Sequence, residues 1–306
     1  MIKATIIADS VSAHTGQRIT TLELEYPRFI HAEFMTHRQF SRNASSSRAI
    51  PINKMIEQVT TNRAEPTHWG LNQAGMQATD EQANTTLAVN AWIDACNDAI
   101  KHAKKLRDLG LHKQIVNRVL EPYQMIKVLV TATNFDNFFA LRLHKDAQPE
   151  IQELARVMYD AIHTSVPVLL HDGDWHTPYY DKGYWTKDST DDLITALKIS
   201  CSCAAQVSYR KLDDSLEKAL AIYDKLVASE PVHASAFEHC ATPLPSKTQN
   251  GITHVRIDGP LCSGNFEQWV QYRQLIKNHE CREFKKWQSV NKLKENSAVY
   301  QVLTLQ

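Results

Sequence analysis

The N-terminal part of the chain alternates in a way that predicts two neighbouring strands. Residues 3–8 and 18–26 alternate polar with apolar or β-branched residues, the pattern of a strand that buries one face. Pro27 ends the second strand, because proline cannot donate to a sheet ladder. Apolar residues then fall at roughly helical spacing over residues 29–35, so we expect a short helix before the polar stretch that follows.

Helical periodicity returns in later segments of the chain. We expect helices over residues 79–109, where Gly110 would end the helix, and over residues 138–143, 147–162, 215–228 and 266–287. Residues 125–132 are apolar enough for a buried strand, and the aromatic run at residues 171–185 is expected to be a loop. This mixture predicts an α+β fold, a mixed sheet with long helices.

Length and charge limit the classes of function. The chain has 306 residues, enough for one large domain or two modest ones, and a formal net charge of zero. A neutral protein has no global field that attracts nucleic acid or membrane surfaces, so neither is an expected partner. No run is apolar enough to span a membrane and no signal peptide is evident, which indicates a cytoplasmic protein.

The six cysteines do not form a metal-binding pattern, since none belongs to a C-x-x-C pair. The spacing leaves open a zinc site built from Cys201, Cys203, His239 and Cys240. Buried free thiols in a reducing compartment explain the same residues, and we therefore expect no metal.

Residues 36–48 form a polar segment that contains three arginines, one histidine and four serines, and no carboxylate. Arginine offers paired donors to phosphate, and serine hydroxyls with backbone N–H groups complete an oxygen shell. The segment is therefore a candidate anion site with a nucleotide as its natural ligand. A solvated basic loop is the alternative interpretation. Three other polar clusters in the chain help to decide between the two.

Each of these clusters alone could be structural. Arg118 precedes the strand expected at residues 125–132, and Asn137 and Arg142 lie on one short helix. Residues 233–239 bring two histidines and a glutamate into one stretch. Isolated side chains of these types are commonly hydrogen-bonding parts of the scaffold.

Together the clusters resemble the flavin-dependent thymidylate synthases. That family has an Arg-His-Arg signature, then seven residues, a serine and, two positions further, an arginine; here Thr36-His37-Arg38 precedes Ser46 and Arg48 at that spacing. Four other segments match, and the family's pattern is given after each. Arg118-Val119-Leu120-Glu121-Pro122 resembles an arginine before a Leu-Pro strand entry, and Leu141-Arg142 with residues 147–151 resembles Leu-Arg followed by Ala-Gln-x-Glu-Ile. Residues 204–209 resemble Ala-Ala-Arg-Val-Ser, and residues 233–239 resemble His-x-x-Pro-Phe-Glu-His.

The order of these motifs differs from the family. Its last two elements normally precede the Arg-His-Arg signature, whereas here they follow it, so the chain resembles a circular permutation. We expect residues 200–245 to fold back beside residues 20–50. The whole chain would then be one domain, with the signature part at 1–165, a linker loop at 166–198 and the permuted part at 199–306.

Other departures concern the site. Thr36 replaces the first arginine of the signature, Glu33 stands where the family usually has glutamine, and Ala44 where it often has glutamate. The spacing between Asn134 and Asn137 is also shorter than in the family. These differences leave the flavin-phosphate contacts and the identity of the pyrimidine open.

The resemblance implies an activity. The family transfers a methylene group from methylenetetrahydrofolate to C5 of dUMP; reduced FAD supplies a hydride, NADPH reduces the flavin, and the sites are shared within a homotetramer. The implied substrate-binding residues are Glu33, Ser46, Ser47, Arg48, Arg118 and Arg142, and the implied FAD-binding residues are His37, Arg38, Asn43, Asn137, Asp146, Ser235 and Glu238. Arg142 and His233 are the implied catalytic residues, with Arg142 stabilising charge on the uracil ring.

Alternatives remain at this stage. One is a related flavoenzyme that methylates or hydroxymethylates another pyrimidine nucleotide, which would suit the changed Glu33, Thr36 and Ala44. Another is a non-catalytic protein that binds nucleotides or nucleic acid through the same basic loop. A metal-dependent hydrolase built on the histidines is a third.

Overall fold

The computed structural model describes residues 1–75, 78, 84–208, 215–229, 232–249, 252–255 and 265–280. Several predictions lie partly or wholly outside this range. They concern Tyr209, Cys262, Cys281, and parts of the helices expected over 79–109 and 266–287.

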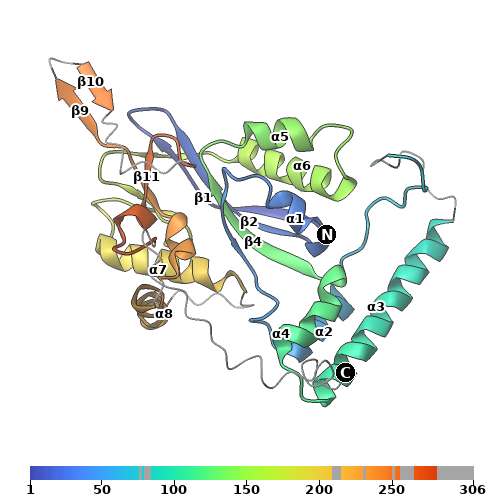
Figure 1. The fold of residues 1–306 in the computed structure, drawn as a ribbon. Helices are drawn as coiled ribbons and strands as arrows, with labels where there is room; N and C mark the ends of the chain where they lie inside the picture. The colour runs from blue at the N-terminus through green and yellow to red at the C-terminus, as the bar shows by residue number, and fades with distance from the viewer. Residues whose placement is uncertain are drawn as a thin grey trace, which may run out of the picture.

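The first half of the chain builds one mixed sheet, so the predicted α+β fold is confirmed (Figure 1). Its order is β3-β4-β2-β1-β5, where the strands are β1 (Lys3–Ser12), β2 (Arg18–Pro27), β3 (Ser41–Ala44), β4 (Met125–Ala132) and β5 (Val168–Leu170). β1 and β2 pair antiparallel as a hairpin and β4 is a buried strand, as the alternation and the apolar run predict. β3 lies at the edge of the sheet, beside β4 alone.

α5 (Asp136–Arg142) and α6 (Pro149–Thr164) pack with this sheet around the main core and confirm two predicted helices. α6 begins with Pro149 at its first turn, where the missing N–H has no helical partner to lose. One face of α6 is buried, at Ile151, Leu154, Ala155, Met158 and Ile162. Both helices lie above the sheet in Figure 1, so the end of α5 that carries Arg142 is fixed by the core.

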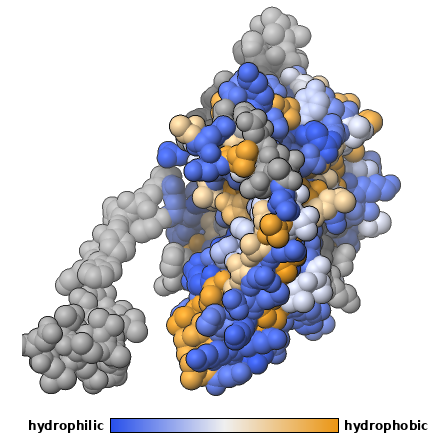
Figure 2. Space-filling view, turned by 90° about the vertical axis from the view of Figure 1, so that its right-hand side faces the viewer, coloured by the Kyte–Doolittle hydropathy of each residue, from blue (hydrophilic) through white to orange (hydrophobic). Residues whose placement is uncertain are grey.

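A second, smaller core lies among α2 (Ile52–Thr61), α3 (Thr85–Asp108), α4 (Lys113–Val116) and the 3₁₀ segment η2 (Asn117–Tyr123). The side chain of Asn84 caps α3, and Gly110 follows its end with φ +81°, as predicted for the helix terminus. Apolar residues on this side of the molecule remain exposed, and Figure 2 shows them interspersed with hydrophilic ones; Leu87 is 65% exposed and Leu109 is 67% exposed.

The second half forms a separate layer beside the sheet (Figure 1). It contains the helices α7 (Leu193–Ala205) and α8 (Leu216–Ala228), the 3₁₀ segments η3 (Gln206–Ser208), η4 (Ala234–Glu238) and η6 (Tyr272–Leu275), and the hairpin β9 (Ser246–Gln249) with β10 (Ile252–Val255). A small sheet runs β11-β8-β6-β7, with β6 (Trp175–His176), β7 (Tyr184–Trp185), β8 (Ala241–Pro243) and β11 (Trp269–Gln271).

Two predictions in this half need correction. Residues 171–185 are mostly turns, as a loop would be, but they also contain β6 and β7, which pair with each other; Trp175 and His176 of β6 are buried. The described part of the helix expected over 266–287 is instead β11 followed by η6, since Trp269 is fully buried and pairs its strand with β8. The proposed domain boundaries stay predictions.

The segment between β2 and β3 carries the signature residues. It contains η1 (Arg28–Ile30) and α1 (His31–Phe34), which confirm the short helix, and then a turn that leads into β3. Ile30 and Phe34 are fully buried, so the chain is fixed just before His37. None of the described helices combines the length and apolarity needed to span a membrane.

Candidate functional site

Arg142 and His37 form the centre of the candidate site. Arg142 ends α5, and its Nε donates a hydrogen bond of 3.0 Å to Nε2 of His37. Because Nε2 accepts, the imidazole is neutral and carries its proton on Nδ1. Burial, reinforced by the charges of Arg142 and Arg42, lowers the pKa of His37 to about 4. The histidine therefore stays uncharged at neutral pH and orients the guanidinium.

A carboxylate flanks the same guanidinium. Glu33 Oε2 lies 3.9 Å from the nearest nitrogen of Arg142. The backbone of Glu33 is held by Thr36, whose hydroxyl donates to the Glu33 carbonyl at 2.7 Å. Two of the residues that depart from the family pattern thus lie at the centre of the site and touch each other.

A small pocket opens beside this pair. It has a volume of about 200 Å³ and is lined by Thr36, His37, Arg38, Gln39, Phe40, Asn134, Asn137, Phe138, Leu141 and Arg142. The rings of Phe138 and His37 are nearly perpendicular, with centroids 4.8 Å apart. Aromatic rings therefore form part of the wall, and polar groups supply the hydrogen bonds.

The lining fits part of a flavin. Arg38 and Asn137 are both exposed at the pocket, so a guanidinium and an amide are available to a phosphate or to the edge of a planar ring. FAD is much larger than this pocket, which would enclose only a portion of it. The remainder would extend over neighbouring surface.

Two of the four residues expected to hold phosphate contact Glu121. Ser47 Oγ donates to Glu121 Oε1 at 2.7 Å, and Arg118 Nη1 lies 3.1 Å from the same oxygen. Ser47 is buried, whereas Arg118 and Arg48 are exposed. Ser46, the next serine of the loop, is half-buried. The structure therefore brings Ser47 and Arg118 together, as the resemblance implies, but on a carboxylate of the protein itself.

The second half of the chain packs on β3, the strand that follows the signature. The Nδ2 of Asn43 donates to the carbonyl of Ala204 at 3.1 Å. Gln271 Nε2 donates both to Ser41 Oγ at 3.0 Å and to the Glu238 carbonyl at 2.9 Å, and so ties β3 to η4. Residues 200–245 thus fold back beside residues 20–50, and this prediction is confirmed for the described residues.

The expected flavin residues of η4 differ in accessibility. His233 precedes η4 and Ser235 lies within it, and both side chains are exposed. Glu238 is half-buried and forms a close ion pair with Arg273. Asn43 and Glu238 are thus engaged by the protein, while His233 and Ser235 face outward. Their assignments as cofactor ligands stay predictions.

Arg42 is a residue of the site that the sequence reasoning missed. Its Nη1 donates to the carbonyls of Met35 at 2.8 Å and His37 at 3.0 Å, so it fixes the turn that carries the signature. Burial lowers the pKa of Arg42, and the carboxylate of Glu238 in η4 partly opposes that shift. The only signal in the sequence is its position among the arginines of residues 36–48.

A buried polar chain connects η4 to the sheet. Ser10 Oγ and Thr21 Oγ1 each hydrogen-bond one ring nitrogen of His176, at 2.9 and 2.8 Å. Thr131 Oγ1 bonds both Thr21 at 2.7 Å and Nδ1 of His239 at 2.8 Å. Burial lowers the pKa of each histidine to about 3, so both rings are neutral. His239 directly follows Glu238, and this chain therefore positions η4.

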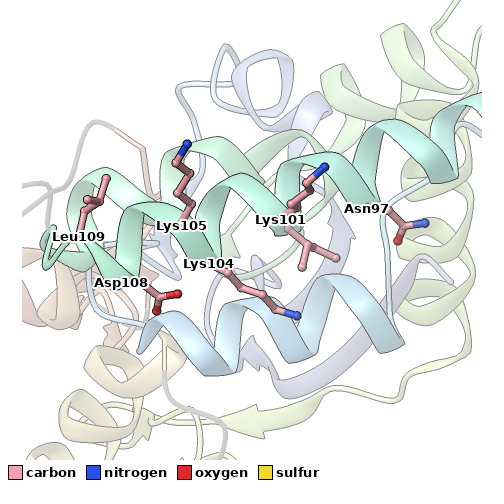
Figure 3. Close-up of a pocket in the computed structure, with 7 residues that line it drawn as sticks. Asn97, Lys101, Lys104, Lys105, Asp108 and Leu109 are labelled. Atoms are coloured by element: carbon pink, nitrogen blue, oxygen red, sulfur yellow. The ribbon is translucent and has the colours of Figure 1, made fainter.

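Other hollows lie outside this centre. Asp146 is exposed and lines a pocket of about 880 Å³ with Phe29, Trp92 and Gln148 among its walls. A hollow of about 640 Å³ follows α3 and contains none of the expected site residues. In Figure 3 Lys101 and Lys105 project from one side of α3 and Lys104 from the other, so the lysines do not converge on one point. Among the described residues, no three His, Cys, Asp or Glu side chains are grouped to hold a metal ion.

Comparison with known proteins gives one family. The model of the family described as "Thymidylate synthase complementing protein" matches residues 11–168, about half of the chain. This range includes His37, Arg118 and Arg142 but ends before η4. No protein in a search of curated proteins matches.

Two solved structures are similar at low identity. Both are of the UMP/dUMP methylase PolB from Streptomyces cacaoi, one bound with 5-Br UMP (TM-score 0.45) and one with 5-Br dUMP (TM-score 0.44). Each is 18% identical and covers 53% of this chain, with 88% and 89% of the respective neighbour covered. These neighbours are too distant to bear on the substrate, and the family assignment rests on the family model.

Proposed function

Because the chain belongs to the thymidylate synthase complementing protein family, a family of methyltransferases, we propose that it is an FAD-dependent thymidylate synthase. The proposed reaction is the reductive methylation of dUMP to dTMP, with methylenetetrahydrofolate as carbon donor and NADPH as reductant. A tetramer is part of the proposal, because a shared site would use the exposed Arg48 and His233 of the protomer.

The observation that carries the proposal is the hydrogen bond between Arg142 and His37. The two residues belong to motifs more than one hundred positions apart in sequence, and both motifs resemble the same family. A guanidinium is permanently charged and is held here by a neutral imidazole, so it would stabilise negative charge on a pyrimidine ring without moving a proton. In the proposed reaction the protein would therefore contribute the position and the positive charge of Arg142.

A bound FAD would supply the hydride, and the protein would align it. Arg38 and Asn137 would bind the flavin at the pocket beside His37, and the ring of Phe138 would exclude water from one side. Ser46, Ser47, Arg48 and Arg118 would hold the nucleotide phosphate.

The test is an absorbance spectrum of the purified protein after incubation with FAD and removal of the excess, followed by titration with dUMP. Retained flavin whose bands shift with dUMP would support the proposal and lead to a turnover assay with methylenetetrahydrofolate and NADPH. Protein that retains no flavin under any of these conditions would overturn it.

A different pyrimidine is the second candidate, and the Glu33 carboxylate favours it. A glutamate beside Arg142 can accept from an amino group such as N4–H₂ of cytosine, which glutamine would recognise less selectively. Methylation or hydroxymethylation of a cytosine nucleotide would then be the reaction. Flavin bands that respond to dCMP but not to dUMP would favour this candidate.

A further inference from the structure

Arg28, Ser47 and Arg118 converge on a single oxygen, and together with Glu121 they form what we name the Glu121 cluster. Oε1 of Glu121 lies 2.7 Å from Ser47 Oγ, 3.1 Å from Arg118 Nη1 and 3.2 Å from Arg28 Nη2. Two guanidinium groups and a hydroxyl around one anionic oxygen is the donor set that proteins use for phosphate. Here the oxygen belongs to the chain itself.

The backbones of two of the three donor residues are held by contacts that do not involve the carboxylate. Asn117 Nδ2 donates to the Ser47 carbonyl at 2.7 Å and to the Ile50 carbonyl at 2.9 Å, which holds the serine loop on η2. The backbone N–H of Arg28 donates to the Gln124 carbonyl at 2.8 Å. The backbones that carry Arg28 and Ser47 would therefore stay in place if the side chain of Glu121 turned away.

The carboxylate can be reached from solvent. The side chain of Glu121 is 20% exposed and that of Arg118 is 58% exposed, so an incoming anion meets both groups at the surface. Glu121 also interrupts the sequence at this point, because it stands between Leu120 and Pro122 where the family pattern has Leu-Pro. The anion of the cluster is thus a residue that the resemblance does not account for.

We propose that Glu121 occupies the phosphate position of the nucleotide site, and that a phosphate monoester binds by displacing it from Arg28, Ser47 and Arg118. The part of this inference that concerns dUMP rests on the proposed function, whereas the part that concerns phosphate binding does not. The carboxylate neutralises one of the two arginines, whereas a dianionic phosphate neutralises both. Glu121 therefore keeps the donors ordered without ligand and lowers the affinity for any phosphate that must replace it.

The experiment measures ligand affinity in the full-length protein and in Glu121→Gln. Glutamine keeps an acceptor for Ser47 but removes the competing charge, so we expect inorganic phosphate and dUMP to bind about tenfold more tightly, with deoxyuridine unchanged. The gain should shrink at high salt, since partly exposed charges are screened. Glu153→Gln is the matched control, because Glu153 pairs with Arg156 on α6 and makes the same change in net charge.

A second variant tests the same site independently, in case Glu121→Gln does not fold. Arg118→Met removes the most exposed donor and should weaken the binding of inorganic phosphate about tenfold. Phosphate affinity that is equal or weaker in Glu121→Gln than in the wild type, or unchanged in Arg118→Met, would overturn the inference. Tighter binding of inorganic phosphate without any binding of dUMP would uphold the anion site and instead count against the proposed function.

Discussion

Thr131→Val removes the central hydroxyl of the buried chain that links η4 to the sheet. Valine has nearly the same shape, so the substitution deletes two hydrogen bonds, to Thr21 and to His239, with little change in packing. Thr21 keeps its bond to His176. His239 keeps none, because Nε2 already lacks a hydrogen-bond partner and Nδ1 loses the one it has.

The magnitude follows from the burial of this histidine. His239 is fully buried, and an orphaned polar group in such a place costs about 1–3 kcal/mol. The lost bond to Thr21 adds about 1 kcal/mol. We therefore expect the free energy of unfolding to fall by about 2–4 kcal/mol.

Urea denaturation followed by tryptophan fluorescence measures this change, since Trp269 packs against His176 in the same region. Thr5→Val is the control: Thr5 is an exposed residue of β1, and its substitution should shift stability by less than about 0.5 kcal/mol. A Thr131→Val protein as stable as the Thr5→Val protein would refute the view that the chain holds η4 in place.

Three further predictions concern pH, backbone and catalysis. His176 and His239 have pKa values of about 3, below the value of about 6.5 in an unfolded chain, so the protein loses stability as the pH falls below 6.5. The free energy of unfolding in urea should be lower at pH 5 than at pH 7 by roughly 2 kcal/mol for each buried histidine. Equal stability at the two pH values would contradict this. Gly183→Ala should lower the melting temperature far more than Gly16→Ala, because both glycines have positive φ but only at Gly183 would a Cβ lie 2.8 Å from the Cβ of Ala8. Arg142→Lys should reduce turnover about 100-fold, since lysine has no Nε donor for His37 and no planar guanidinium to present at the same time, whereas Arg156→Lys on the surface of α6 should be neutral in the same assay.

The sequence was most informative where a segment's own pattern decides its structure. β1, β2 and β4 and the helices α5 and α6 were predicted from alternation, periodicity and helix-end signals. The small sheet was missed because β6 and β7 have two residues each, too few to show a period, and exist only through pairing with distant strands. Motif resemblance singled out His37 and Arg142 separately, but their hydrogen bond was not predicted. The Glu121 cluster likewise depends on which charges meet in space, and no spacing along the chain predicts that.

β3 is the strand at which the second half of the chain meets the main sheet. β3 is the edge strand of the main sheet, and an uncovered edge leaves unpaired backbone groups beside the signature turn. Ala204, at the end of α7, and Gln271, in β11, bind the side chains of Asn43 and Ser41 and so cover this edge. These contacts join residues 161 and 230 positions apart, so the fold and not the neighbourhood in sequence brings them together. Contacts of this kind between the second half of the chain and the signature segment are what the expected permutation requires.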